Sequence, residues 1–155
     1  MKHLSYFTGL ICLVSFAGCS KTADVSETYS MTFGDSKAIL IEPASHDRTF
    51  TAGWSVEGGG GMHGYVVTAN DEKSALKGMD ESPSPDKKTI IKDTADKPCS
   101  MKDKAKHEFT FVAKANQGYA LVLHRSINDN VDHKGAPKDA KVKVDIKEVK
   151  GKTGG

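Results

Sequence analysis

Neither sign of charge dominates this chain of 155 residues. Lysine and arginine together number 22, aspartate and glutamate number 20, and the formal net charge at pH 7 is +2. A protein that binds nucleic acid through its phosphates normally carries a strong basic excess on one face. The sequence therefore predicts no nucleic-acid partner.

Long apolar runs are also missing, and a short one stands at the N-terminus. It extends over residues 4–16 and follows Lys2 and His3. As a helix it would measure roughly 20 Å, less than the roughly 30 Å of a bilayer core. A basic start, a short apolar run and small residues after it are the layout of a secretory signal. We expect residues 1–18 to be removed as a signal peptide.

Residues 16–19 (FAGC) resemble the lipobox of bacterial lipoproteins. That resemblance implies that Cys19 becomes the first mature residue and carries a diacylglyceryl group through a thioether, with no other cofactor. Residues 19–26 would then be a tether to the membrane of a bacterial cell envelope. Ser20, rather than Asp, follows Cys19, which implies the outer membrane in a Gram-negative cell. The alternative is plain secretion with a cut after Ala17.

Cysteine is scarce, and the three thiols have different expected fates. Cys12 leaves with the signal peptide and Cys19 carries lipid, so Cys99 remains without a partner in its own chain. We interpret Cys99, which follows Pro98, as a small apolar loop residue. The alternative is a thiol that reacts or pairs between chains.

Recognisable enzyme motifs are absent. The chain has no G-x-S-x-G, no H-E-x-x-H, and no serine or cysteine in a known nucleophile context. The glycine run 58–61 lacks the Lys-Ser/Thr ending of a phosphate-binding loop, so we interpret it as a flexible connection. The sequence predicts a protein that is not an enzyme.

Seven short segments carry β-branched and aromatic residues at period two, between Gly, Pro, Asn or Asp. In one of them Phe109 and Phe111 share a face, and in the last Val142, Val144 and Ile146 lie opposite a row of lysines. Those lysines favour a half-exposed strand at a sheet edge. The segments are residues 28–33, 37–42, 48–56, 64–68, 107–113, 118–125 and 141–149.

This spacing predicts an all-β fold, an antiparallel β-sandwich of about seven strands over residues 27–150. Residues 115–118 (ANQG) would form a hairpin or a tight corner. Residues 151–155 would be a flexible tail.

A charged stretch interrupts the strands. Between residues 71 and 106, nine lysines and eight acidic residues account for 17 of 36 positions. Such a composition buries little, so we expect a partly mobile insertion with a brief strand at 89–91. At most one short helix is expected, over residues 71–79, where Ala75, Leu76 and Met79 would form an apolar stripe.

The order of these parts resembles small bacterial β-sandwiches of the pre-peptidase C-terminal type. The resemblance covers about residues 37–70 and 107–149, where an F-x-F strand is followed by a turn and a G-Y-x-L-x-V-like strand. It implies a non-catalytic accessory domain.

Two metal sites are worth considering. A calcium loop that starts at Asn128 would place Asn130 third, Asp132 fifth and Asp139 twelfth, all oxygen donors. His133 stands where such a loop needs Gly, and the alternative is a loop that folds its own turns with Asn and Asp.

A copper or zinc site is the second option, because imidazole and thioether are suitable ligands. The mature chain keeps five histidines, but no two stand in an H-x-H or H-x₃-H spacing. For His124, a surface position at a strand end is the preferred interpretation. The candidate ligands are His46, His63, His107, His124 and His133, with Met62 and Met101.

The chain has a single tryptophan, Trp54, in the strand 48–56. Alternation places it on one face with Phe50, Ala52 and Val56, so we expect a core residue whose indole N–H finds an acceptor. The alternative is an exposed platform for a glycan or a protein partner near the 58–61 loop.

Together these features predict a membrane-anchored, non-enzymatic interaction or structural module of the bacterial envelope. The alternative is a periplasmic metal-binding protein that uses the His and Met residues, or calcium at residues 128–139.

Overall fold

The computed structural model describes residues 24–58, 60–77, 87–125 and 137–150. This part of the chain contains eight strands and one short helix, α1 (Glu72–Ala75), which Asp71 caps through its side chain. The strands are β1 (Val25–Thr32), β2 (Ser36–Ile41), β3 (Arg48–Val56), β4 (Met62–Thr68), β5 (Ser100–Met101), β6 (Lys106–Ala113), β7 (Tyr119–Arg125) and β8 (Asp139–Glu148). All seven predicted strands are confirmed, and β5 is an eighth.

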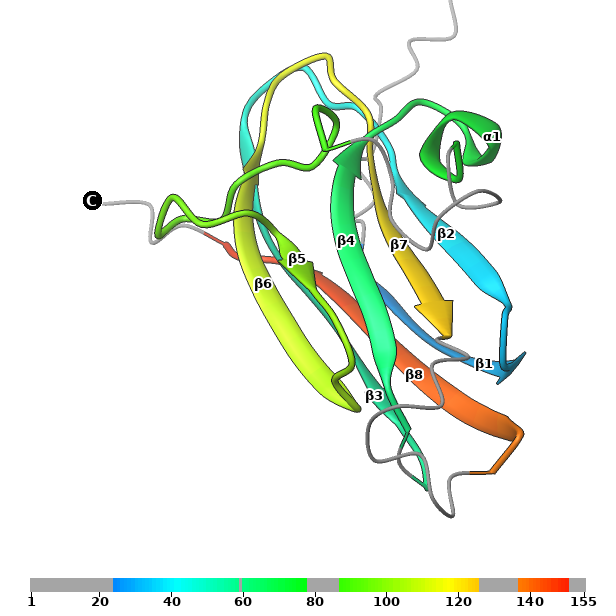
Figure 1. The fold of residues 1–155 in the computed structure, drawn as a ribbon. Helices are drawn as coiled ribbons and strands as arrows, with labels where there is room; N and C mark the ends of the chain where they lie inside the picture. Colours follow the sequence, from blue (N-terminus) through cyan, green and yellow to red (C-terminus); the bar gives the residue numbers. More distant parts are fainter. Residues whose placement is uncertain (1–23, 59, 78–86, 126–136, 151–155) are drawn as a thin grey trace, which may run out of the picture.

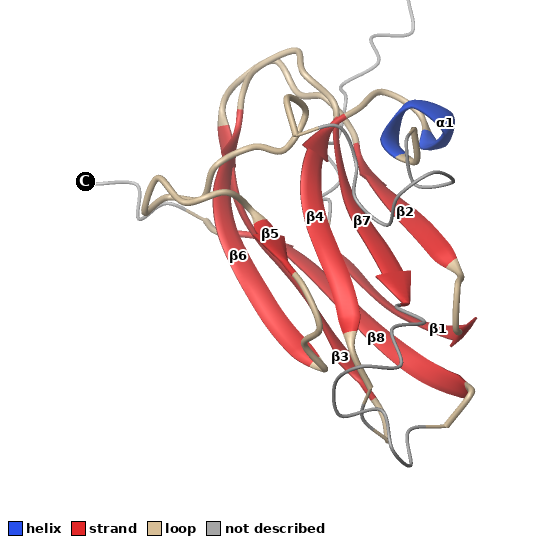
Figure 2. Ribbon diagram, viewed as in Figure 1, coloured by secondary structure: helices blue, strands red, loops and turns tan. Residues whose placement is uncertain are grey.

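The strands form two antiparallel four-stranded sheets that pack face to face (Figure 2). Sheet A has the order β1-β8-β3-β6 and sheet B the order β2-β7-β4-β5. The predicted all-β sandwich is therefore confirmed. The lysine-bearing strand β8 pairs with both β1 and β3, so its predicted edge position is wrong. Its lysines are exposed because the outer face of sheet A is open, and not because the strand lies at an edge.

Successive long strands alternate between the sheets. β1, β3, β6 and β8 lie in sheet A, whereas β2, β4 and β7 lie in sheet B. The segment 114–118 therefore turns a corner between two sheets and is not a hairpin. Asn116 adopts a positive φ of 59° in this corner, a conformation that Asn tolerates better than most residues.

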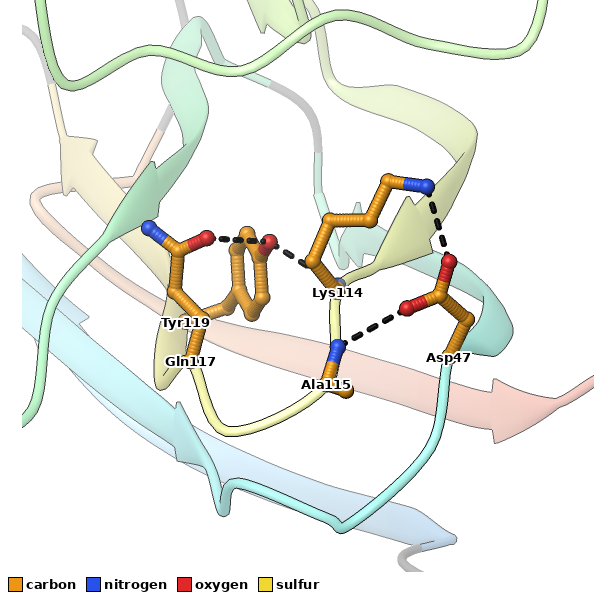
Figure 3. A network of polar contacts seen from close by, with 5 residues as sticks. All are labelled: Asp47, Lys114, Ala115, Gln117 and Tyr119. Atoms are coloured by element: carbon orange, nitrogen blue, oxygen red, sulfur yellow. Dashed lines mark hydrogen bonds and ion pairs between the residues drawn. The ribbon is translucent and has the colours of Figure 1, made fainter.

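A polar network holds this corner against the loop before β3 (Figure 3). The Asp47 carboxylate accepts hydrogen bonds from the Ala115 amide at 2.9 Å and the Lys114 ammonium at 2.8 Å. The Tyr119 hydroxyl accepts from the Lys114 amide at 3.0 Å and donates to Gln117 Oε1 at 3.1 Å. These contacts lower the pKa of Asp47, first through the bond from Lys114 and next through the Ala115 amide.

The main core lies between the sheets and follows the period-two pattern. Trp54 is only 3% exposed, and its indole N–H donates to the Lys104 carbonyl at 3.0 Å. Gly64 on β4 makes room for the ring, since a Cβ there would lie 2.2 Å from Cζ3 of Trp54. The expectation that Trp54 is a core residue is confirmed, so an exposed platform is not present at this residue.

Sheet B is also buried on its outer face. Tyr65, Val67 and Val122 form a second cluster there, to which α1 contributes Ala75 and the following segment Ile90. Residues 89–91 bond to β4 through the Thr89 carbonyl and the Ile91 amide. This part of the charged stretch 71–106 therefore extends the sandwich, because its few apolar side chains dock while its charged ones face solvent.

The two ends of the sandwich differ in the chain segments that they carry (Figure 1). At the upper end, as drawn, β4 ends, and the 114–118 corner and α1 are found. At the lower end β1 leads into β2 and β5 leads into β6. We use the names upper end and lower end below.

Candidate functional site

The lower part of sheet B brings two histidines together. His63 at the start of β4 and His124 near the end of β7 are directly opposite each other in the strand register. Their ring centroids are 6.0 Å apart, and the ring planes meet at 77°. The residues are 3% and 8% exposed, on the outer face that also holds Tyr65 and Val122. This buried pair is the centre of the candidate site.

His63 is held by polar groups on both ring nitrogens. Its Nε2 lies 3.0 Å from Asp103 Oδ1, and its Nδ1 lies 3.4 Å from the Tyr65 hydroxyl. Asp103 has a positive φ of 52° in the turn between β5 and β6. Asp accepts this conformation more readily than most residues. The turn thus places a carboxylate against an imidazole from another strand.

His124 has a different environment. Its Nδ1 lies 2.9 Å from the Ser36 hydroxyl of β2. Burial lowers the pKa of His124, His63 lowers it further, and the nearby carboxylate of Asp35 opposes the change. The predicted surface position of His124 is wrong. The pairing of β7 with both β2 and β4 covers the ring from two sides.

Arg125, the next residue, is buried on the opposite face of the same sheet. Its Nη1 donates to the Met31 carbonyl at 3.2 Å, its Nη2 donates to the Pro137 carbonyl, and the guanidinium lies 4.6 Å from the centre of the Phe33 ring. Its Nε has no hydrogen-bond partner within the described part of the chain. Burial lowers the pKa of Arg125, against the attraction of Asp139 and Asp35.

The His124 imidazole can take up a proton, but burial lowers its pKa and makes this harder than in water. As a metal site the pair offers two imidazoles, with Asp103 next to one of them. Among the described residues, no group of three or more His, Cys, Asp or Glu side chains is placed to hold a metal ion. Of the other predicted ligands, His46 is exposed in a loop and Met62 lies in the main core.

His107 is a further predicted ligand, and it lies in the other sheet from the pair. It is on β6, with its ring 5.7 Å from that of Trp54 and 4.7 Å from that of Phe109. Burial and the nearby Lys104 lower its pKa. The structure thus brings two of the candidate histidines together and leaves His46 and His107 elsewhere.

Several predicted site residues lie outside the described part of the chain. These are the lipidation residue Cys19, the calcium-loop residues Asn128, Asn130 and Asp132, and the candidate ligand His133. Asp139, the last member of that loop, is exposed at the start of β8.

Cys99 is the free cysteine of the described residues, and it is buried in the main core beside β5. Burial, with a smaller effect of Asp93, raises its pKa to about 12. A buried neutral thiol is a poor nucleophile, because the thiolate is the reactive form. The interpretation of Cys99 as a small apolar residue is confirmed.

Sequence reasoning did not identify Ser36, Tyr65 or Asp103 as members of the histidine site. They come from β2, β4 and the turn after β5, and only the strand pairing brings them together. The one local signal is that His63 and Tyr65 share a face of a strand at period two.

Comparison with known proteins adds no further identification. No protein-family model matches the chain, and no curated protein is significantly similar to it in sequence. Within the described residues, no helix has both the length and the apolar character required to cross a membrane.

Proposed function

We propose that this protein is a lipid-anchored, non-enzymatic module of the bacterial cell envelope. Its acyl groups on Cys19 would hold a β-sandwich at a membrane surface, where the sandwich serves as an interaction or structural domain. A partner would be another envelope protein or a glycan.

One observation carries this proposal. The apolar N-terminal run ends at Phe16, Cys19 follows it after Ala17 and Gly18, and β1 begins only six residues after Cys19, at Val25. Asp24 already belongs to the fold, because its carboxylate accepts a hydrogen bond from the Glu148 amide at 3.0 Å. A signal-like segment joined this directly to a folded domain favours an anchor followed by a short tether.

The balance of charge argues against a nucleic-acid-binding protein and is compatible with an interaction module. After removal of residues 1–18, which include Lys2, 21 basic residues face 20 acidic ones. The outer face of sheet A carries exposed lysines from β8 beside Asp145, and Lys143 pairs with Asp145 at 3.2 Å. Mixed surface charge of this kind is typical of a soluble domain.

Membrane partition tests the anchor. The full chain is produced in a bacterial host, and the membranes are extracted by detergent phase separation. The wild-type protein is expected in the detergent phase, and Cys19→Ser in the aqueous phase or retained as the unprocessed precursor. Cys12→Ser is the matched control, since it removes a thiol from the signal segment and should leave partition unchanged. Aqueous wild-type protein would refute the anchor.

Metal handling is the second candidate function. The observation that favours it is the buried pair His63 and His124, whose imidazoles lie close enough for both to approach one ion. Elemental analysis of protein purified without chelators separates the two candidates. One equivalent of copper, zinc or calcium per protein chain would favour metal handling. Less than about a tenth of an equivalent would favour the interaction module.

A further inference from the structure

We propose that β1 is a self-association edge, at which two copies of this chain pair their β1 strands antiparallel and join their copies of sheet A into one continuous sheet. This inference goes beyond the proposed function and does not depend on a lipid anchor at Cys19. It names both the surface, the outer edge of β1, and its occupant, the β1 strand of a second copy.

The strand register shows which backbone groups of β1 point away from the sheet. In an antiparallel pair, alternate residues direct their N–H and C=O groups toward one neighbouring strand, and the residues between them direct theirs to the other side. The Glu57 amide donates to the Lys141 carbonyl, so the odd-numbered residues of β8 bond to β3 and the even-numbered ones bond to β1. The even-numbered residues of β8 are opposite the odd-numbered residues of β1. The outward groups of β1 are therefore those of Ser26, Thr28 and Ser30.

This edge of β1 is open. Within the described part of the chain, no hydrogen bond reaches the outward N–H and C=O groups of Ser26, Thr28 or Ser30, and all three residues are exposed. Thr32, at the lower end, is already bonded, through its amide to Asp35 Oδ2 at 2.7 Å and through its carbonyl to the Asp35 amide at 3.2 Å. Natural sheets commonly protect an edge with Lys, Pro or a bulge. β1 has none of these over the eight residues that it keeps in register with β8.

The other three sheet edges are better protected. β5 is only two residues long. β6 begins with Lys106, and its outward Thr110 carbonyl accepts from the Thr94 amide at 2.8 Å. β2 carries Lys37 and packs against α1 at the upper end. Among the four edges of the two sheets, β1 thus offers the longest unprotected row of backbone groups.

The residue order of β1 is self-complementary about Thr28. When Thr28 lies opposite the partner's Thr28, every residue of the segment 25–31 meets one of matching chemistry, and the outward backbone groups of the two copies face each other. Such a pairing would exchange about six backbone hydrogen bonds. The remaining pairs, each formed twice, are Ser26 with the partner's Ser30, Glu27 with the partner's Tyr29, and Val25 with the partner's Met31.

These pairs suit the two faces of the joined sheet. Val25 and Met31 already pack in or against the main core, so their pairing would extend its apolar row across the seam. On the outer face the Ser and Thr hydroxyls would meet, and such cross-strand pairs stabilise a sheet. Glu27, the charged residue of β1, would lie opposite a tyrosine and not a second carboxylate. The two Lys143 ammonium groups, on β8 opposite Thr28, would be three strand spacings or about 14 Å apart, more than a Debye length in physiological salt.

Symmetry favours a second copy over another protein as the occupant. A two-fold interface uses the same patch on both chains, so each residue must suit its opposite number in both directions. The order of residues about Thr28 meets that requirement, whereas a strand from an unrelated protein would need no such order. The pairing also uses the open edge of both copies, so the assembly closes as a dimer.

Disulfide cross-linking of the full chain in whole bacterial cells tests the register. In an antiparallel hydrogen-bonded pair the Cα atoms are about 5.5 Å apart, a distance that a disulfide spans. Thr28→Cys should therefore form a dimer under copper-phenanthroline oxidation. Ser26→Cys is the matched control on the same edge, because two copies of residue 26 would be about 13 Å apart along the strand. Wild-type protein gives the background from Cys19 and Cys99.

We expect at least about fivefold more dimer from Thr28→Cys than from Ser26→Cys. Chains with Ser26→Cys and chains with Ser30→Cys, produced together, should cross-link to each other, since these positions are opposite in the paired strands. Equal yields from Thr28→Cys and Ser26→Cys, or no Thr28→Cys dimer above the wild-type background, would overturn the proposal.

A second arm removes the pairing without touching the core. Thr28→Lys would place two ammonium groups directly opposite each other, and like charges in that position destabilise strand pairing. Val112→Lys is the matched control, since it adds the same charge to an exposed position on β6, the other edge strand of sheet A. In sedimentation velocity of the detergent-extracted chain, Thr28→Lys should weaken dimerisation about tenfold or more, and Val112→Lys should leave it unchanged. Equal weakening by both variants, or a wild-type chain that stays monomeric across the concentration series, would contradict pairing through β1.

Discussion

At the scale of single residues, the burial of His124 opposes the protonation of its ring. A histidine that is 8% exposed, beside a second imidazole, is harder to protonate than one in water. The Ser36 hydroxyl satisfies Nδ1 and leaves the ring neutral at low cost. The folded site is therefore stable while the His124 ring is neutral, and protonation of that ring at low pH strains it.

The first prediction concerns this strain. The folded state holds the pKa of His124 below its ordinary value of 6.5, so the unfolded state binds more protons as the pH falls below about 6.5. Stability is then full above this pH and is lost toward acid, with a slope of at most about 1.4 kcal/mol per pH unit from one group. His124→Gln should show a shallower loss between pH 7 and 5 in urea denaturation.

The exposed His46 provides the control for this experiment. His46→Gln removes an exposed histidine and leaves the buried ones in place. The dependence of its stability on pH should follow that of the wild type. Parallel profiles for the wild type and His124→Gln would contradict the assignment of the strain to His124.

The second prediction concerns the contact between Trp54 and Gly64. Gly64→Ala would place a methyl group 2.2 Å from the indole ring, so the ring or the strand must shift. Overpacking of this kind costs typically about 1–3 kcal/mol. In a double-mutant cycle of Gly64→Ala and Trp54→Phe, the smaller phenylalanine ring should reduce the loss of stability that Gly64→Ala causes. Additive urea midpoints would contradict a direct clash.

At the scale of the elements, the corner between β6 and β7 links the two sheets. The network of Asp47 and Tyr119 accepts hydrogen bonds from two of its backbone amides, those of Lys114 and Ala115 (Figure 3). The corner therefore contributes to the stability of the sandwich.

The third prediction tests this link. Tyr119→Phe removes the hydroxyl that accepts from the Lys114 amide, and leaving that group unpaired should cost about 1–2 kcal/mol. Hydrogen exchange of the Lys114 amide should become faster as well. Tyr29→Phe is the matched control, since the Tyr29 hydroxyl donates to exposed Glu27 at a sheet edge. An equal, small effect of both substitutions would contradict the role of Tyr119.

The strands were predictable because their signal is local. Alternation in residues 107–113 and 141–149 specifies which side chains face the core, and Phe109, Phe111, Val142, Val144 and Ile146 are all buried there. The sheet order is different, since β4 pairs with β7 and β3 with β8 across long stretches of chain. No local pattern encodes such pairings.

The candidate site depends on those distant pairings, so the sequence offered His63 and His124 only as two of several candidate ligands. His63 and His124 are opposite each other only because β4 and β7 are neighbours. A surface position was predicted for His124, yet both His124 and its neighbour Arg125 are buried. Two backbone carbonyls and the Phe33 ring accommodate the Arg125 guanidinium.

At the scale of the whole molecule, the account joins a short N-terminal tether to a sandwich with two unlike ends. β1 begins level with the middle of β3, because Val25 and Ala52 both lie opposite Ile146. The lower part of sheet B carries the histidine pair. The proposed anchoring depends on the identity of the mature N-terminus.

The mass of the mature N-terminal peptide tests that central claim most directly. Protein is extracted from bacterial membranes with detergent, digested, and its first peptide measured by mass spectrometry. The account predicts a chain that begins at Cys19 and carries a diacylglyceryl group on its sulfur. A chain that begins at Gly18, with an unmodified Cys19 thiol, would contradict it.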